Sequence, residues 1–256
     1  APVVGDQDLC ERFKELIDPL RFPENGLTED DVIEVRRIKA RVDAAAGREV
    51  QLLGEGWNFG EVANGARFVQ ASQLSLKGSG IATFSDRARD AVRGGSAGDS
   101  DARQVSAQGW INGLVYDRNA LAPADLGQAE LMRMADLVRV GLAGSLRSYP
   151  LQTYRGETVP LERIDYNGQP AGYVSEPGEV VNYVENHDNQ TLYDLNAFKL
   201  PLDTGIDDRA RVQDAVDRRF SRARYDAQRR IGAFLEELRA GRAAPEAVEP
   251  VRREVL

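Results

Sequence analysis

Two short polar segments contain the residues best suited to chemistry, and each follows an apolar run. The first is Gly54-Glu55-Gly56-Trp57, which follows the apolar stretch 49–53. Glycines let a ligand approach the backbone closely. An indole beside a carboxyl group offers a stacking face and a low-dielectric wall, and these conditions suit a general acid. Glu55 is therefore a candidate acid. The alternative, which the spacing alone favours, is an ordinary turn with a solvated glutamate and a core tryptophan.

The second polar segment runs from Glu185 to Asn189 and follows the apolar stretch 180–184. The Asp188 carboxylate can stabilise a developing positive charge, and the His187 imidazole can hydrogen-bond a ligand hydroxyl. Judged alone, this segment is better explained as a loop in which Asp188 or Asn189 caps a helix that begins near Thr191. Cys10 has no partner motif and is more typical of a small buried residue than of a nucleophile.

Helical periodicity predicts most of the elements that would position these segments. Residues 84–93 form a short helix that Ser85 caps and Gly94-Gly95 ends. The other helices are predicted over 29–46, 127–142 and, as a long or broken amphipathic helix, 207–241. We expect residues 207–238 to be mostly helical. Beyond Pro245 we expect little order. The residues expected to pack in this region are Val216, Phe220, Ile231 and Leu235.

Short apolar runs predict buried strands at 49–53 and 180–184, whereas 96–109 and the Gly- and Pro-rich stretch 155–178 are predicted to be loops. Alternating helices and apolar strands indicate an α/β fold with a parallel sheet. In such folds the chemistry lies at the carboxyl ends of the strands. Both polar segments occupy such ends, so we expect Glu55 and Asp188 to face the same side and to approach each other closely.

Composition narrows the class of partner. The 256 residues carry 33 basic and 41 acidic side chains, a net charge of −8, which argues against nucleic acid and anionic membranes. Neutral polymers remain compatible. One cysteine and one histidine exclude an intrachain disulfide and argue against a structural zinc site, so we expect no metal and no cofactor. No obligate protein partner is inferred, and no apolar run is long enough to span a membrane. Without a recognisable signal peptide we lean towards a cytoplasmic location. The Ala1 start suggests a processed, cloned or incomplete chain.

Residues 48–213 resemble the catalytic barrel segment of the pullulanase-type α-1,6-glucosidases, the starch-debranching branch of the α-amylase glycoside hydrolase superfamily. The resemblance is collinear and rests on long strings. These strings are LGEGWNFGEV (53–62), ASQL (71–74), GSGIATFSDR (78–87), DAVRGG (90–95), DYNGQPAGY (165–173), VNYV (181–184) and HDNQTL (187–192).

The resemblance implies a fold and a set of roles. The fold would be a partial (β/α)8-type barrel with a helical C-terminal extension. Glu55 would be the general acid/base, and Asp188 would stabilise the oxocarbenium-like transition state. His187, Asn189 and Trp57 would bind the sugar. The family hydrolyses α-1,6-glucosidic linkages in pullulan, amylopectin and limit dextrins with retention, so it also needs a carboxylate nucleophile about 5–5.5 Å from the acid.

The match fails at both ends of the chain. Near the start, Leu20-Arg21-Phe22-Pro23 resembles the nucleophile motif, but Pro23 occupies the position of the carboxylate; Asp18 and Glu24 lie close to it in sequence. Beyond residue 213 the Arg-rich sequence has no counterpart in the family. We therefore divide the chain into a partial catalytic domain, 1–206, and a divergent helical extension, 207–256. A fragment, a frameshifted reading and an artificial sequence would each explain this pattern.

Three functions follow. The chain is an α-1,6-glucan hydrolase or a working part of one, or it is a catalytically silent remnant that at most binds α-glucan. The third is a helical interaction module, supported only by 207–241, where a solvated charged helix is the simpler explanation.

Overall fold

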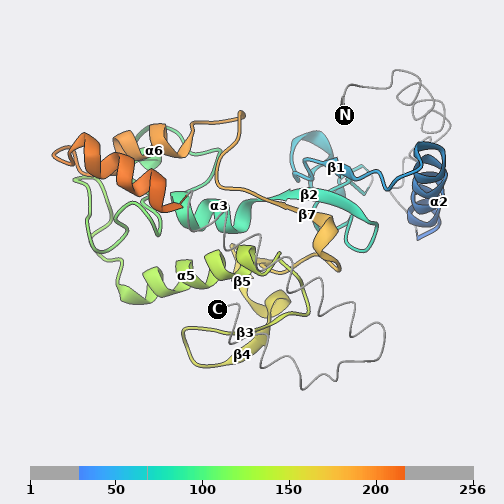
Figure 1. Ribbon diagram of the computed structural model, residues 1–256. Coiled ribbons are helices and arrows are strands. Elements are labelled where there is room, and N and C mark those ends of the chain that lie inside the picture. Colours follow the sequence, from blue (N-terminus) through green and yellow to red (C-terminus); the bar gives the residue numbers. More distant parts are fainter. Residues whose placement is uncertain (1–28, 68, 217–256) are drawn as a thin grey trace. The chain divides into compact units, whose positions relative to one another are not determined.

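The computed structural model describes residues 29–67 and 69–216 (Figure 1). Two compact units make up the chain, Ala1–Phe84 and Ser85–Leu256. The helices are α2 (Glu29–Ala46), α3 (Asp86–Arg93), α4 (Asp101–Ser106), α5 (Gln128–Leu142) and α6 (Leu192–Lys199), with short 3-10 turns at Gly60–Gly65, Leu161–Arg163 and Pro177–Glu179. The strands are β1 (Leu52–Gly54), β2 (Ile81–Ser85), β3 (Pro150–Gln152), β4 (Thr158–Pro160), β5 (Asp165–Tyr166), β6 (Gln169–Pro170) and β7 (Val180–Asn182).

In the first unit, helix α2 has the predicted bounds and buries Ile38 and Val42. Strands β1 and β2 pair in parallel, with Leu52 opposite Ile81. The prediction of a buried strand over 49–53 is wrong in two respects: the strand begins at Leu52, and Leu53 is 59 % exposed. Successive side chains of a strand point to opposite faces, and only one face of this three-residue strand is covered.

Strand β2 was not predicted, because its sequence runs directly into a helix. The predicted helix 84–93 begins instead at Asp86 and ends at Arg93. Ser85 occupies the N-cap position, as predicted, but its hydroxyl makes no capping hydrogen bond and lies 3.4 Å from the Ser145 hydroxyl. A distant side chain therefore replaces the expected local partner.

The core of the second unit forms around α3 and α5, which pack side by side (Figure 1). The crossing is close because Gly141 has no side chain: a Cβ there would lie 2.3 Å from the Cβ of Ala88. Helix α5 has essentially the predicted bounds, and its Leu137 and Val138 are buried as the periodicity predicts. The two helices provide the apolar face against which the following segments fold.

The stretch 155–178 is not the surface loop that its glycines and prolines predict. It contains β4, β5 and β6, and its side chains Leu161, Ala171 and Tyr173 are almost completely buried. Two antiparallel pairs, β3–β4 and β5–β6, fold it back onto α3 and α5. Its strands are only two or three residues long, too short for an alternating pattern to be recognised.

The predicted loop 96–109 contains the helix α4. Partners distant in sequence hold its end in place: the Asn119 side chain donates to the Val105 carbonyl at 2.9 Å, and Lys199 donates to the Ala107 carbonyl at 2.6 Å. Six residues contain too little periodicity to be recognised against a polar background.

At the C-terminal end of the described chain, residues 206–216 are helical and Val216 is buried in the core. The predicted contacts of Phe220, Ile231 and Leu235 and the predicted tail beyond Pro245 lie outside the described residues. Mixed helices and parallel strands agree with the predicted α/β class, although the described strands are few and short. The partial barrel and the domain boundary near 206 stay predictions. Within the described ranges, no helix is long and apolar enough to cross a membrane.

Candidate functional site

Glu55 lies immediately after β1, in a turn whose backbone conformation is strongly constrained. Gly56 has φ +73°, and a Cβ there would lie 2.6 Å from the Thr83 methyl group. Gln73 fixes this turn to β2, because its backbone N–H donates to the Gly56 carbonyl at 2.9 Å and its side chain donates to the Phe84 carbonyl at 2.7 Å. The Glu55 side chain is exposed and Trp57 is half-buried. The turn therefore presents a carboxylate next to an indole.

The second polar segment follows β7 and presents His187 and Asp188 to solvent. The His187 side chain is 93 % exposed, and its Nδ1 lies 3.1 Å from an Asp188 carboxylate oxygen. Asn186 contributes twice, because its side-chain oxygen accepts the Asp188 N–H at 3.2 Å and its amide nitrogen lies 3.4 Å from the carboxylate. The segment therefore orders Asp188 locally while leaving it accessible to a ligand.

Asp188 and Asn189 do not cap the next helix, although Glu185 of the same segment accepts the Leu192 N–H at 2.6 Å. Helix α6 is capped by Thr191, whose hydroxyl accepts the Asp194 N–H at 3.2 Å. Asn189 has a different partner, since its side-chain oxygen accepts a hydrogen bond from Arg93 at 2.8 Å. Neither Asp188 nor Asn189 is needed to begin α6.

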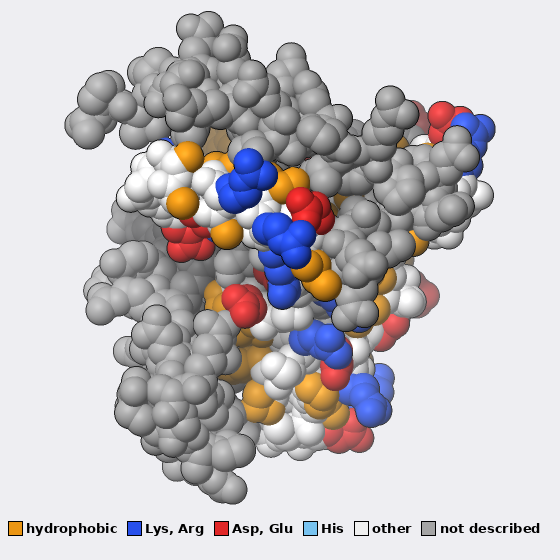
Figure 2. Space-filling model, turned by 90° about the vertical axis from the view of Figure 1, so that its right-hand side faces the viewer, with side chains coloured by type: hydrophobic (Ala, Val, Ile, Leu, Met, Phe, Trp, Pro, Cys, Tyr) orange, Lys and Arg blue, Asp and Glu red, His pale blue; other side chains and the backbone are white. Residues whose placement is uncertain are grey.

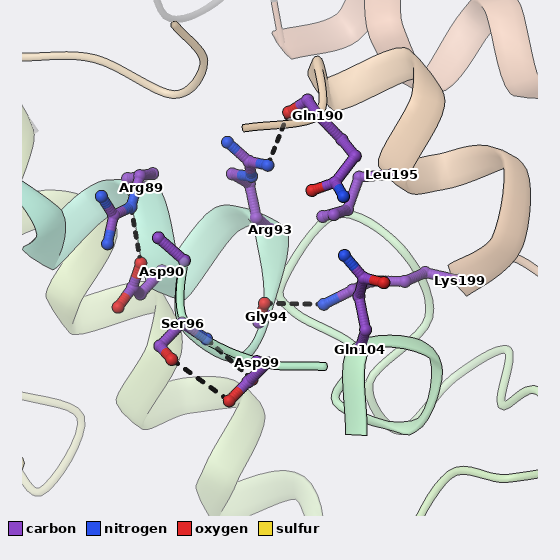
Figure 3. Close-up of a pocket in the computed structure, with 11 residues that line it drawn as sticks. Arg89, Asp90, Arg93, Gly94, Ser96, Asp99, Gln104, Gln190, Leu195 and Lys199 are labelled. Atoms are coloured by element: carbon purple, nitrogen blue, oxygen red, sulfur yellow. Dashed lines mark hydrogen bonds and ion pairs between the residues drawn. The ribbon is translucent and has the colours of Figure 1, made fainter. Parts of the chain in front are cut away.

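Two arginines of α3, one helical turn apart, hold the end of β7 and the segment after it. Arg89 donates to the Tyr183 hydroxyl at 2.6 Å. Arg93 donates to the Gln190 carbonyl at 2.7 Å and points towards that residue in Figure 3. The sequence analysis had assigned neither arginine a role, although both belong to the strings that resemble pullulanases. Their position on a helix that precedes the polar segment by nearly a hundred residues gave no local signal.

Arg89 also belongs to a buried polar network with Asp90 and two tyrosines. It donates to the Asp90 carboxylate at 2.7 Å, and the Tyr166 hydroxyl donates to the other oxygen at 2.6 Å. Burial works against the charge on Arg89, but Asp90 and, after it, Tyr183 together raise the arginine pKa. Burial likewise raises the pKa of Asp90 despite its partners, and it raises the pKa of Tyr166 and Tyr183.

Lys199, at the end of α6, binds the backbone that follows α3 and α4. Its ammonium group is buried and donates to the Gly94 carbonyl at 2.7 Å (Figure 3) and to the Ala107 carbonyl at 2.6 Å. Burial, followed by the charge of Arg93, lowers the Lys199 pKa to about 8. The cavity between α3 and α6 has a volume of about 20 Å³, which is the room that one water molecule needs. This cavity is too small for a sugar.

The described residues form no metal-type cluster, and the face in Figure 2 carries charged side chains of both signs. Within residues 29–67 and 69–216, no group of three His, Cys, Asp or Glu side chains is placed to hold a metal ion. On the face shown in Figure 2, the described basic and acidic side chains are interspersed with hydrophobic ones.

Glu55 belongs to the first unit and Asp188 to the second. Within the second unit, the structure brings His187 next to Asp188. Within the first unit, Trp57 follows Glu55 by two residues in the same turn. The predicted approach of the two carboxylates stays a prediction, as do the roles of all five residues.

Known proteins resemble about two thirds of this chain strongly. It is 43 % identical over 169 residues to a pullulanase of Klebsiella aerogenes and 38 % identical over 178 residues to chloroplastic pullulanase 1 of Arabidopsis thaliana, matches that cover 66 % and 68 % of the chain. The crystal structure of a maltotriose complex of PulA from Klebsiella pneumoniae superposes with a TM-score of 0.63 and 40 % identity over 71 % of the chain. The chain is a partial relative of the pullulanases.

This pullulanase relative spans 15 % and 18 % of the length of the two curated enzymes, and 19 % of the crystallised chain. No protein-family model matches it. A second and shorter similarity involves 42 residues, 62 % identical to a bifunctional glutamine synthetase adenylyltransferase/adenylyl-removing enzyme of Streptomyces coelicolor. That match covers 16 % of the chain and 4 % of the enzyme. The pullulanase relative therefore also carries a stretch similar to a protein of a different activity.

Proposed function

We propose that this chain recognises α-glucan through residues of a debranching, retaining glycosidase, the class that hydrolyses α-1,6-glucosidic linkages in pullulan, amylopectin and limit dextrins. The observation that carries the proposal is the identity of about 40 % with pullulanases over two thirds of the chain. The exposed Glu55, directly after β1, and the exposed Asp188, in the loop that follows β7, support it.

Each side chain has a role that its chemistry permits. Glu55 would donate a proton to the glycosidic oxygen and later accept one from water. Asp188 would stabilise the positive charge that develops on the sugar ring, and His187 and Asn189 would hydrogen-bond its hydroxyls. The half-buried indole of Trp57 would stack on a sugar face. These roles require both carboxylates to act on the same sugar.

The first candidate function is hydrolysis of the recognised α-glucan. The second candidate function is α-glucan binding without turnover. A retaining glycosidase needs a carboxylate nucleophile, and Pro23 occupies that position in the closest matching string. A pyrrolidine ring cannot attack an anomeric carbon. Binding is therefore the property that both candidates share, and it is the one to test first.

The chain has only two tryptophans, Trp57 and Trp110, so intrinsic fluorescence can report on the site. Maltotriose, the sugar bound in the similar crystal structure, serves as the probe. We expect its addition to change the fluorescence of the wild-type chain and of Trp110→Phe, whose indole packs against the core of the second unit. In Trp57→Phe the change should disappear.

Either of two results would contradict the proposal. One is a fluorescence change that persists in Trp57→Phe and disappears in Trp110→Phe, because the sugar would then bind elsewhere. The other is the absence of binding at millimolar maltotriose in isothermal calorimetry with the wild-type chain.

A further inference from the structure

We propose that Arg93 is a positioning residue for the segment that carries His187 and Asp188. This positioning role rests on the proposed function in one respect, namely that the segment contacts the sugar. Arg93 comes from α3 and touches neither His187 nor Asp188. It acts through the Val184 and Gln190 carbonyls on both sides of them and through the Asn189 side chain.

The Arg93 guanidinium bridges the two ends of the segment. One terminal nitrogen donates to the Val184 carbonyl at 3.3 Å and to the Asn189 side-chain oxygen at 2.8 Å, and the other donates to the Gln190 carbonyl at 2.7 Å. Val184 immediately precedes the segment, and Gln190 immediately follows it. The three hydrogen bonds therefore join the start of a short loop to its end, with Asp188 between the two anchor points.

Arg93 can hold the loop because it is itself held. The side chain is buried with 5 % of its surface exposed, and its backbone carbonyl accepts a hydrogen bond from the buried Asn112 at 2.9 Å. The next residue, Gly94, accepts from Lys199. Figure 3 shows the Arg93 side chain directed to Gln190 and the Lys199 side chain directed to Gly94 at this end of α3. The loop is thus fixed to a rigid element.

The planar guanidinium is essential to this arrangement. Its nitrogens are separated and oriented, so one side chain reaches acceptors at both ends of the loop. A lysine ammonium is a single point and cannot bridge them. Burial lowers the Arg93 pKa, and the nearby positive charge of Arg89 adds to this effect. The Arg93 guanidinium is therefore a desolvated cation, and the orientation of its N–H groups, as well as its charge, lets it bridge the two ends of the loop.

The chain contains one histidine, His187, which gives this proposal a direct spectroscopic readout. In a protein carrying a histidine-free purification tag, the single imidazole Cε1–H resonance belongs to the loop without further assignment. We expect Arg93→Gln to shift or broaden this resonance and to weaken maltotriose binding about tenfold. Arg93→Lys should restore the signal only in part.

Arg209 provides a matched control. It also donates to several backbone carbonyls, those of Thr204, Asn196, Ala197 and Pro201, and none of them belongs to the loop after β7. Arg209→Gln should lower the unfolding temperature in a similar way while leaving the His187 resonance unchanged. If Arg93→Gln fails to fold, the comparison of Arg93→Lys with the wild-type chain decides the question.

The outcomes separate the two proposals. An unchanged His187 resonance in folded Arg93→Gln and Arg93→Lys overturns the positioning role. A changed resonance in these variants, with a wild-type chain that does not bind maltotriose, supports the positioning role and contradicts the proposed function. A His187 change of equal size in Arg209→Gln would show that the effect is general destabilisation, and the positioning role would be rejected.

Discussion

At the scale of single residues, Gly56 decides whether Glu55 can be presented as it is. Its positive φ disfavours any side chain by about 1 kcal/mol, and a Cβ would also collide with the buried Thr83. Gly56→Ala should therefore lower the free energy of unfolding by about 3 kcal/mol. Gly60→Ala is the matched control, since Gly60 has φ +75° and open space around it. It should cost about 1 kcal/mol. Equal losses in urea unfolding would show that the collision is relieved without cost.

The second prediction at this scale is a pH dependence of stability that arises from Lys199, whose pKa of about 8 lies below its ordinary value. The unfolded chain binds a proton at this lysine up to about pH 10.4, whereas the folded chain releases it from about pH 8. The unfolded state therefore binds more protons between these values, and stability should rise with pH. Relative to Lys199→Met, the wild-type chain should gain about 2 kcal/mol between pH 8 and pH 10.

Unfolding by urea at pH 8, 9 and 10 measures this difference. Comparing the two proteins at each pH cancels the tyrosines Tyr166 and Tyr183, whose raised pKa values act in the opposite direction in this range. A difference that stays constant, or that falls with pH, would mean that the two carbonyl partners keep Lys199 charged.

Residue identities could be read from the sequence, whereas their partners could not. An apolar run followed by a polar tip is a local pattern, and it correctly placed Glu55 directly after β1. The second strand ends at Asn182 and not at the predicted residue 184, so His187 and Asp188 lie in the loop beyond it. The contact between Arg93 and Gln190 joins residues 97 positions apart. No local periodicity encodes such a pair, so the arginine that holds the second segment was missed.

At the scale of elements, Arg87 fixes the segment with β5 and β6 to α3. Its guanidinium is fully buried between the rings of Tyr166 and Tyr173, each 4.6 Å away, and it donates to the Pro170 carbonyl at 3.2 Å and pairs with Asp86. Removing one member of a buried charged cluster is costly. Arg87→Ala should lower the free energy of unfolding by about 3–5 kcal/mol, and Arg87→Lys should not restore it, since an ammonium cannot stack in the same way.

Arg155 supplies the control for this prediction. It lies over the Tyr154 ring at 5.5 Å but at an exposed site. Arg155→Ala should leave thermal unfolding unchanged. If Arg87→Ala is as stable as Arg155→Ala, the clamp between α3 and the β5–β6 pair does not contribute to stability.

The same segment shows where element prediction fails. Long periodic elements such as α2 and α5 were predicted to within one residue, because many positions contribute to the pattern. Stretch 155–178 is rich in glycine and proline, yet it fills the core through isolated side chains such as Leu161 and Tyr173. Tyr173 stacks on Arg87, and the strands of this stretch are only two or three residues long, so neither feature leaves a periodic pattern in the sequence.

At the scale of the whole molecule, the chain combines a long stretch similar to pullulanases with a short one similar to an adenylyltransferase. The sequence analysis recognised the first through its motifs and described the Arg-rich C-terminal region as having no counterpart in that family. A protein that matches 15–18 % of the length of its relatives can share their local geometry without sharing their turnover. Binding and hydrolysis must therefore be measured separately.

The last prediction concerns hydrolysis. We expect the purified chain to release reducing sugar from pullulan at least about a thousand-fold more slowly than a full-length pullulanase, because removing a nucleophile costs several powers of ten in rate and Pro23 stands where a carboxylate is needed. Pro23→Asp alone should not restore the rate, since the carboxylate must also lie about 5–5.5 Å from Glu55. Glu55→Gln is the control for any residual activity. Rapid pullulan cleavage by the unmodified chain, abolished by Glu55→Gln, would mean that another carboxylate acts as nucleophile. Glu24, adjacent to Pro23, would then be the first residue to mutate in the search for that nucleophile.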